Sequence, residues 1–205
     1  NEKFQQMMKL NKLLLLILFF WIKPALAENL DENFIYKSGY QSSDIKTLLT
    51  EAKAISNCSE RECTQHSLAI KNLFKNNKLD ASAIKYVMKQ EYPNLENEGN
   101  IGQIIGYNFE NLLINLAIDG KEKYLDMLFY TADQKKYPEY TKLMEEYENI
   151  KVRREKYVNS LCFLDSNLIS DGSLYPNLYA RCLVEKNRDY LNVTEKTIES
   201  VQSFE

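Results

Sequence analysis

Residues 162–182 read CFLDSNLISDGSLYPNLYARC, with a cysteine at each end and an Asp-Gly-Ser turn between them. The apolar residues on both sides of the turn recur at spacings of three and four, which is typical of amphipathic helices. Pro176 suits the first turn of the second helix, where a backbone N–H has no helical partner. The stretch therefore predicts a helical hairpin that a disulfide between Cys162 and Cys182 would lock.

The N-terminal region has the order of a secretory signal peptide. Two lysines precede the apolar run LLLLILFFWI at residues 13–22, and the small-x-small triplet Ala-Leu-Ala follows at residues 25–27. A retained membrane anchor is the alternative, but a membrane-spanning helix needs roughly 20 apolar residues. We therefore expect a signal peptide over residues 1–27, with extra residues before the start methionine. The mature protein would begin at Glu28 and be periplasmic or secreted, in a bacterium.

The four cysteines, Cys58, Cys63, Cys162 and Cys182, all follow the predicted cleavage site. An even number in an oxidising compartment favours two disulfides, for which three pairings are possible. The local pairing is the simplest, and closing the longer loop would stabilise the fold by about 3 kcal/mol. Zinc is the competing interpretation, but the chain has one histidine, His66, and no CxxC pair. We expect no metal and no cofactor.

The charge of the mature chain excludes some partners. Four of the 26 basic and one of the 29 acidic residues lie in residues 1–27, which leaves 22 basic and 28 acidic residues and a net charge near −6. An acidic exported protein is a poor candidate for binding nucleic acid or an anionic membrane. The charge suits a cationic protein partner, or it serves solubility alone.

The rest of the chain also has helical spacing with little strict alternation, so we predict an all-α fold, a small helical bundle with a C-terminal disulfide-locked helical hairpin. Ser43-Asp44 and Asp80 are the predicted caps of two helices. A further helix follows the Cys58–Cys63 turn. The predicted buried faces of these three helices are formed by Ile45, Leu48, Leu49, Ala52 and Ile55, by Leu68, Ile70, Leu73 and Phe74, and by Ile84, Val87 and Met88.

Four more helices are predicted in the second half of the chain. The first spans residues 101–118 and ends at Gly120 as its C-cap, and the second spans residues 121–133. The third runs from Glu139 to about Leu168, with its apolar positions at Tyr140, Leu143, Met144, Tyr147, Ile150, Tyr157, Leu161 and Leu164. The last begins near Pro176 and frays after Asn192. A division near residues 134–138 would separate a helical N-terminal region of unknown role, residues 28–134, from a hairpin domain, residues 135–205.

Residues 139–191 resemble the exported LprI-type family of proposed lysozyme inhibitors. The long helix ends in a cysteine, and Gly172-Ser173 precedes Cys182 by the spacing that this family uses. Tyr175-Pro176 and Tyr179-Ala180 also fit, and Asn187-Arg188 stands where a Thr-x-Arg element is expected. The chain departs from the pattern at Val158, where the family has an arginine, and it lacks the upstream tryptophan. Arg153 and Arg154 lie about one helical turn before Val158 and are the candidates to replace the missing arginine. The resemblance covers about a quarter of the chain.

The resemblance implies a small helical periplasmic domain that binds lysozyme and protects the cell wall. Animal-type lysozymes are basic and carry two carboxylates in a cleft, so an acidic protein would be steered toward them. The candidate inhibitor loop comprises Asp165, Ser166, Asp171, Gly172 and Ser173. The simpler interpretation of Gly172 and Ser173 is that they only turn the chain and cap the next helix.

Other classes of function stay open. An immunity protein that neutralises a periplasmic cell-wall-degrading toxin is the main alternative, since such proteins are also small, exported and often helical. We do not expect an enzyme, because a single histidine and oxidised cysteines leave no clear nucleophile–base pair. A structural protein of the cell envelope is not excluded by the sequence.

Overall fold

The computed structural model of this chain describes residues 31–131, 139–169 and 174–203, which are almost entirely helical. The prediction of an all-α fold is confirmed. The helices are α2 (Glu32–Ser38), α3 (Ser42–Ile55), α4 (Glu60–Lys75), α5 (Ala81–Glu91), the 3-10 turn η1 (Leu95–Asn97), α6 (Asn100–Thr131), α7 (Glu139–Ile169) and α8 (Tyr175–Gln202). None of the helices in these ranges is long and apolar enough to cross a membrane. The predicted signal peptide lies outside the described residues.

The chain divides into two compact units, residues 1–39 and 40–205. The described part of the first unit is the short helix α2. Asp31 begins this helix by accepting the backbone N–H of Phe34 at 3.2 Å, and Gly39 ends it in the left-handed conformation with φ of 70°. The second unit contains all the other helices.

Helix α3 buries the predicted face, but its predicted cap is wrong. The helix begins at Ser42, and Gln41 at the N-cap position makes no side-chain capping bond. Asp44 is buried instead, and its Oδ1 accepts a hydrogen bond from Lys78 Nζ at 3.3 Å. The carboxylate therefore ties α3 to the segment before α5. The predicted cap Asp80 is confirmed, because its carboxylate accepts the N–H of Ser82 at 2.7 Å.

The Cys58–Cys63 disulfide closes the entrance of α4, with 5.3 Å between the two Cα atoms. Glu62 reaches back from the first turn and accepts from the backbone N–H of Ser59 at 3.2 Å and from its hydroxyl at 2.8 Å. These bonds lower the pKa of the Glu62 carboxyl. Ile70 and Phe74 form the buried face of α4, whereas Leu68, which was predicted to join them, is exposed.

Helix α6 is continuous where two helices were predicted. Gly120 is not a C-cap, because it lies inside α6 against α4. A Cβ atom at this position would lie 2.5 Å from the carbonyl oxygen of Lys71 and 2.8 Å from Cβ of Phe74. The glycine therefore permits a close approach of two helices. A single glycine in a helix interior costs only about 1 kcal/mol, so the flanking helical residues carry the helix through it.

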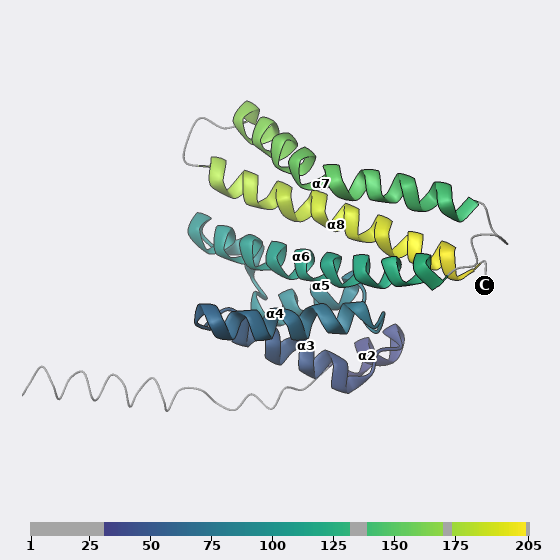
Figure 1. The fold of residues 1–205 in the computed structure, drawn as a ribbon. Coiled ribbons are helices and arrows are strands. Elements are labelled where there is room, and N and C mark those ends of the chain that lie inside the picture. Colours follow the sequence, from purple (N-terminus) through teal and green to yellow (C-terminus); the bar gives the residue numbers. More distant parts are fainter. Residues whose placement is uncertain (1–30, 132–138, 170–173, 204–205) are drawn as a thin grey trace, which may run out of the picture. The chain divides into compact units, whose positions relative to one another are not determined.

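Helix α6 lies between α4 and α8, and α7 packs on α8 (Figure 1). Helices α6 and α8 run parallel, since Asn177 bonds Asn100 and Gln202 bonds Tyr124. Helix α7 returns antiparallel to both. The buried positions of α8 that alternate three and four residues apart are Asn177, Ala180, Val184, Asn187, Leu191, Thr194, Ile198 and Val201. This spacing is that of a coiled-coil seam.

The end of α8 corrects a further prediction. Residues after Asn192 do not fray, because the helix continues to Gln202 and buries Ile198 and Val201. These two residues join a core cluster with Leu125, Leu128, Phe129, Tyr140 and Tyr147. The hydroxyl of Tyr140 donates to the carbonyl of Val201 at 2.9 Å. The predicted division at residues 134–138 falls outside the described residues, but helices from both sides of it pack in one unit.

Candidate functional site at the end of the helical hairpin

A disulfide joins the end of α7 to the beginning of α8. Cys162 is fully buried and pairs with Cys182, with 5.5 Å between the Cα atoms. Together with Cys58–Cys63, this confirms the local pairing among the three that the sequence allowed. Cys162 lies about two turns before the end of α7, and Cys182 lies about two turns after the start of α8. The bridge therefore fixes the distance between the two helices near the end of the hairpin.

A second contact anchors the beginning of α8 to α6. Pro176 occupies the first turn of α8, as predicted, and the buried Asn177 follows it. The amide nitrogen of Asn177 donates to Asn100 Oδ1 at 2.9 Å and to Gln103 Oε1 at 2.6 Å. The beginning of α8 is thus held to α7 by the disulfide and to α6 by hydrogen bonds.

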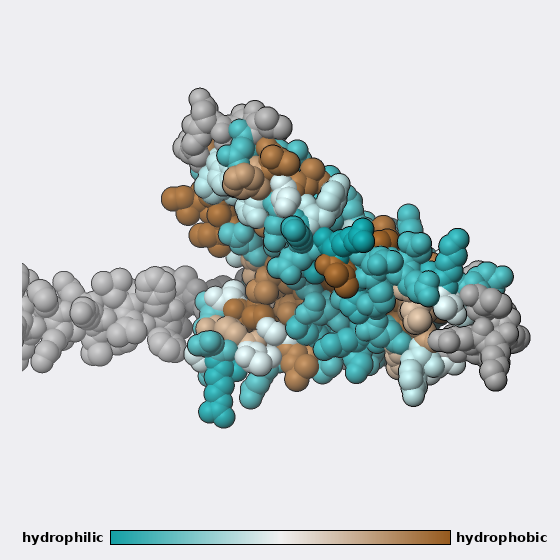
Figure 2. All heavy atoms as spheres, turned by 45° about the horizontal axis from the view of Figure 1, so that its top comes forward, coloured by the Kyte–Doolittle hydropathy of each residue, from teal (hydrophilic) through white to brown (hydrophobic). Residues whose placement is uncertain are grey.

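Apolar side chains gather on the surface at this end. We define the hairpin-end patch as Phe163, Leu174, Tyr175 and Tyr179. Phe163 and Leu174 are 56% and 57% exposed. The ring of Phe163 meets Tyr175 edge-on at 6.3 Å, and Tyr175 stacks on Tyr179 at 5.9 Å. Figure 2 shows apolar side chains beside the turn drawn in grey at the top of the view.

The predicted inhibitor loop is only partly described. Asp165 is exposed on the last turns of α7, two residues after Phe163 and therefore on a different face of the helix. Ser166 is 1% exposed, and its Oγ has no hydrogen-bond partner among the described residues. It therefore faces inward, which corrects its assignment to the contact surface. Asp171, Gly172 and Ser173 lie outside the described residues, and their role stays a prediction.

A shallow pocket of about 290 Å³ lies beside the disulfide, between Asp165 and Arg181. Arg181 is paired with Glu185 one turn along α8, with 3.0 Å between Nε and Oε1. Lys186 completes the charged rim. The residues that line this pocket are distinct from the four residues of the hairpin-end patch.

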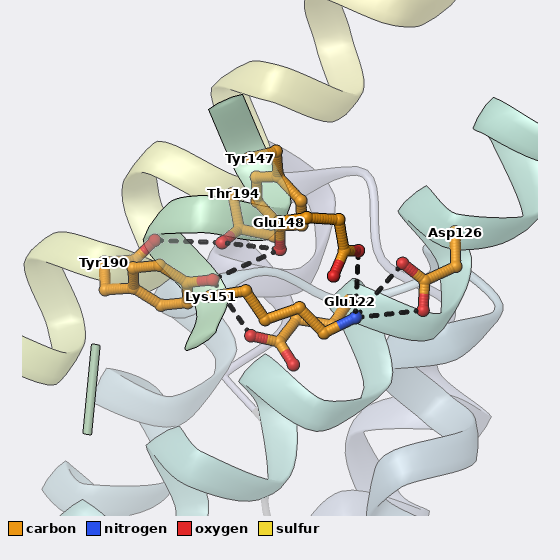
Figure 3. A network of polar contacts seen from close by, with 7 residues as sticks. All are labelled: Glu122, Asp126, Tyr147, Glu148, Lys151, Tyr190 and Thr194. Atoms are coloured by element: carbon orange, nitrogen blue, oxygen red, sulfur yellow. Dashed lines mark hydrogen bonds and ion pairs between the residues drawn. The ribbon is translucent and has the colours of Figure 1, made fainter. Parts of the chain in front are cut away.

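The sequence analysis missed a polar network between α6, α7 and α8, shown in Figure 3. Tyr190 donates to Glu122 Oε1 at 2.9 Å, and its hydroxyl lies 3.4 Å from that of Tyr147. The Tyr147 hydroxyl lies 3.5 Å from Thr194 Oγ1. Burial raises the pKa of the Glu122 carboxyl, while the bond from Tyr190 and the charge of Arg154 oppose the rise. At the edge of the network, the ammonium of Lys151 bridges neighbouring carboxylates, those of Asp126 and Glu148.

A second buried network joins α6 and α8 to the segment before α5. Lys121 is almost fully buried, donates to Asn77 Oδ1 at 2.5 Å and lies 4.0 Å from Glu195. Glu195 accepts the backbone N–H of Ala81 at 3.0 Å. Burial raises the pKa of Glu195 to about 7 despite the charge of Lys121, and burial also lowers the pKa of Lys121.

Both networks connect helices, and Asp126 and Glu148 at the edge of the first also line a surface pocket of about 640 Å³. Within the described ranges, no group of three histidine, cysteine or carboxylate side chains could hold a metal ion. Nδ1 of His66 lies 2.6 Å from Oε2 of Glu51. Both networks join residues that are far apart in sequence, so no local motif could have identified them.

Comparison of the chain with protein-family models, with curated proteins and with solved structures gave no match.

Proposed function

We propose that the protein is exported and inhibits a lysozyme-type cell-wall hydrolase by binding it through the hairpin-end patch. The observation that carries this proposal is the cluster of the exposed Phe163 and Leu174 with the partly exposed Tyr175 and Tyr179, at the end of a hairpin held by the Cys162–Cys182 bridge. Disulfides of this kind persist in oxidising compartments, which supports export. The resemblance of residues 139–191 to the LprI-type inhibitors supports the class of partner.

The rigidity of the hairpin end favours binding. A surface that is already ordered loses little conformational entropy when it meets a partner. Large aromatic side chains at the centre of an interface contribute most of the binding energy in many complexes. Phe163 and Tyr175 are such side chains, and the bridge keeps them in one arrangement.

Charge favours a basic partner. The chain after residue 27 carries a net charge near −6, and Asp165 carries one exposed carboxylate on the last turns of α7. Opposite charge speeds diffusional encounter, and the attraction weakens as salt screens it. A basic animal-type lysozyme fits this description, and a hairpin end that reaches its cleft would block substrate.

The proposed activity is inhibition by binding, without catalysis. Among the described residues, the carboxyl groups with raised pKa values are those of Glu122 and Glu195, and both form hydrogen bonds that connect helices. The hairpin-end patch itself contains no nucleophile–base pair among its described residues. A partner-binding role uses the exposed rings and the fixed geometry, which are the features that this end offers.

The test is inhibition of a basic animal-type lysozyme and of a bacterial muramidase by the oxidised protein, with binding followed by calorimetry. Phe163→Ala and Leu174→Ala should each weaken binding about 10-fold to 100-fold, as expected for interface centres. Tyr130→Ala is the matched control, because Tyr130 is 91% exposed on α6 and outside the patch. Reduction of the disulfides should weaken inhibition.

Two results would overturn the proposal. One is that neither enzyme binds the protein, in which case toxin hydrolases of the immunity-protein alternative become the partners to screen. The other is that inhibition is unchanged in Phe163→Ala and Leu174→Ala, which would place the contact surface elsewhere.

A further inference from the structure

Helix α7 presents a second apolar surface, away from the hairpin-end patch. We define the α7 stripe as Ile150, Tyr157 and Leu164, which are spaced seven residues apart and therefore lie on one face of the helix. They are 47%, 65% and 58% exposed. The sequence grouped them with Tyr140 and Tyr147, which are buried. The helix thus has one apolar face toward the core and another toward solvent.

A groove runs along this outward face between α7 and α8. It has a volume of about 560 Å³ and is lined on α7 by Ile150, Tyr157 and Leu161 and on α8 by Lys186 and Asp189. Its lining combines apolar and charged side chains, among them Arg154, whose guanidinium carbon lies 4.9 Å from the centre of the Tyr190 ring. A groove with this composition suits the side chains of another helix.

Two opposite charges flank Ile150 on this face of α7. Glu146 lies about one turn before it and Arg153 about one turn after it, and both line the groove. Both are exposed. Within the described part of the chain, Glu146 and Arg153 make no ion pair, whereas Lys151 on the inner side is paired with Asp126 and Glu148.

This pattern is complementary to itself in one orientation. Two α7 helices that cross antiparallel at Ile150 bring Glu146 of each copy next to Arg153 of the other. A two-fold axis makes the pair occur twice. The same axis places the two Ile150 side chains together and Tyr157 near Leu143 of the second copy. A parallel arrangement would instead place like charges together.

We propose that a second copy of this chain occupies the α7 groove, forming an antiparallel homodimer across Ile150 with two Glu146–Arg153 ion pairs. The contact involves one helix and its groove, so its area lies at the low end for specific complexes. The dimer is therefore weak and depends on concentration. The hairpin-end patch lies outside the contact, so a dimer presents two such patches.

Sedimentation velocity of the oxidised protein over about 5–500 μM tests this proposal, with dimer appearing as the concentration rises. Ile150→Asp should remove the dimer throughout this range. Val152→Asp is the matched control, because Val152 is 79% exposed on the same helix but outside the groove. The control variant should associate as the parent does, and circular dichroism checks that both variants fold.

Charge reversal tests the orientation. Glu146→Arg and Arg153→Glu should each weaken association about 10-fold, because each brings like charges together twice in the dimer. The double variant Glu146→Arg/Arg153→Glu should recover the parent affinity. The proposal is overturned by a parent protein that stays monomeric at the highest concentration, by a dimer that survives Ile150→Asp, or by a double variant that associates no better than either single one.

Discussion

The side-chain amide of Asn187 on α8 donates to Oδ1 of Asn111 on α6 across 2.9 Å, at a buried position of the seam between these parallel helices. The neighbouring Arg188 pairs with the buried carboxylate of Glu110 on α6. Apolar residues alone would tolerate a shift of one helix along the other. Polar partners that must meet across the seam fix the register, as a buried asparagine does in coiled coils.

We predict that Asn187→Ala lowers the free energy of unfolding by about 1–3 kcal/mol, because it leaves Oδ1 of the half-buried Asn111 without its donor. Urea denaturation monitored by circular dichroism measures the change. Asn167→Ala is the control, since Asn167 is exposed and its amide donates to the backbone carbonyl of Phe163 in its own helix. Equal stability of the two variants would show that the amide pair does not contribute.

The double variant Asn111→Leu/Asn187→Leu tests whether the pair fixes register. We expect it to recover most of the stability of the parent protein, because two apolar residues replace two hydrogen-bonded ones. If the pair fixes the register, α8 of the double variant should shift along α6. This motion should broaden the backbone amide signals of α8 in NMR spectra. Sharp signals at the parent positions would show that the other polar contacts alone determine the register.

Gly120 permits the close contact of α6 with α4. We predict that Gly120→Ala destabilises the protein by about 1–3 kcal/mol, although alanine favours a helix, because the added methyl group meets the Lys71 carbonyl at 2.5 Å. Gly99→Ala is the control, because a Cβ there meets nothing within 4 Å. Chemical denaturation of both variants gives the difference, and a stabilised Gly120→Ala variant would contradict the close packing.

The features of the fold that could be predicted from the sequence are those that depend on a local pattern of residues. The buried faces of α3 and α5, the cap at Asp80, the first turn at Pro176 and the cysteine pairs are all set by spacing over a few residues. Gly120 shows where this fails, because a glycine next to a helix end and a glycine in a helix contact look alike in sequence. Only the presence of α4 distinguishes them.

The candidate site was less predictable for the same reason. The sequence located the hairpin and placed Asp165 at its end, but it assigned Ser166 to the surface because helical phase alone does not reveal which neighbours cover a side chain. The α7 helix carries apolar residues on two faces, and periodicity does not tell which face meets α8. The networks at Glu122 and Glu195 depend on partners 68 and 114 residues away.

The two disulfides should contribute differently to stability. Closing the loop between Cys162 and Cys182, which are 20 residues apart, should contribute about 3 kcal/mol, and the 5-residue separation of Cys58 and Cys63 should contribute about 2 kcal/mol. Cys162→Ala/Cys182→Ala and Cys58→Ser/Cys63→Ser, compared by urea denaturation, measure each bridge. A larger loss from the short bridge would contradict the loop-length argument.

The carboxyl of Glu195 should make stability depend on pH. Its pKa is about 7 in the folded protein, against an ordinary value of 4.5, because burial disfavours the charged form. Asp80 and Glu199 raise it further, while Lys121 and the N–H of Ala81 oppose the rise. The folded state therefore binds a proton more tightly than the unfolded state does.

Because the folded pKa lies above the unfolded one, this stabilisation is complete below about pH 4.5 and is lost as the pH rises through about 7. Glu195→Gln keeps the acceptor for Ala81 but cannot ionise. We predict that the free energy of unfolding of the parent, relative to that of Glu195→Gln, falls by about 1–3 kcal/mol between pH 5 and pH 8. Urea denaturation at several pH values gives this difference, which cancels titrations common to both proteins. Parallel pH profiles for the two proteins would show that Glu195 stays ionised in the fold, paired with Lys121.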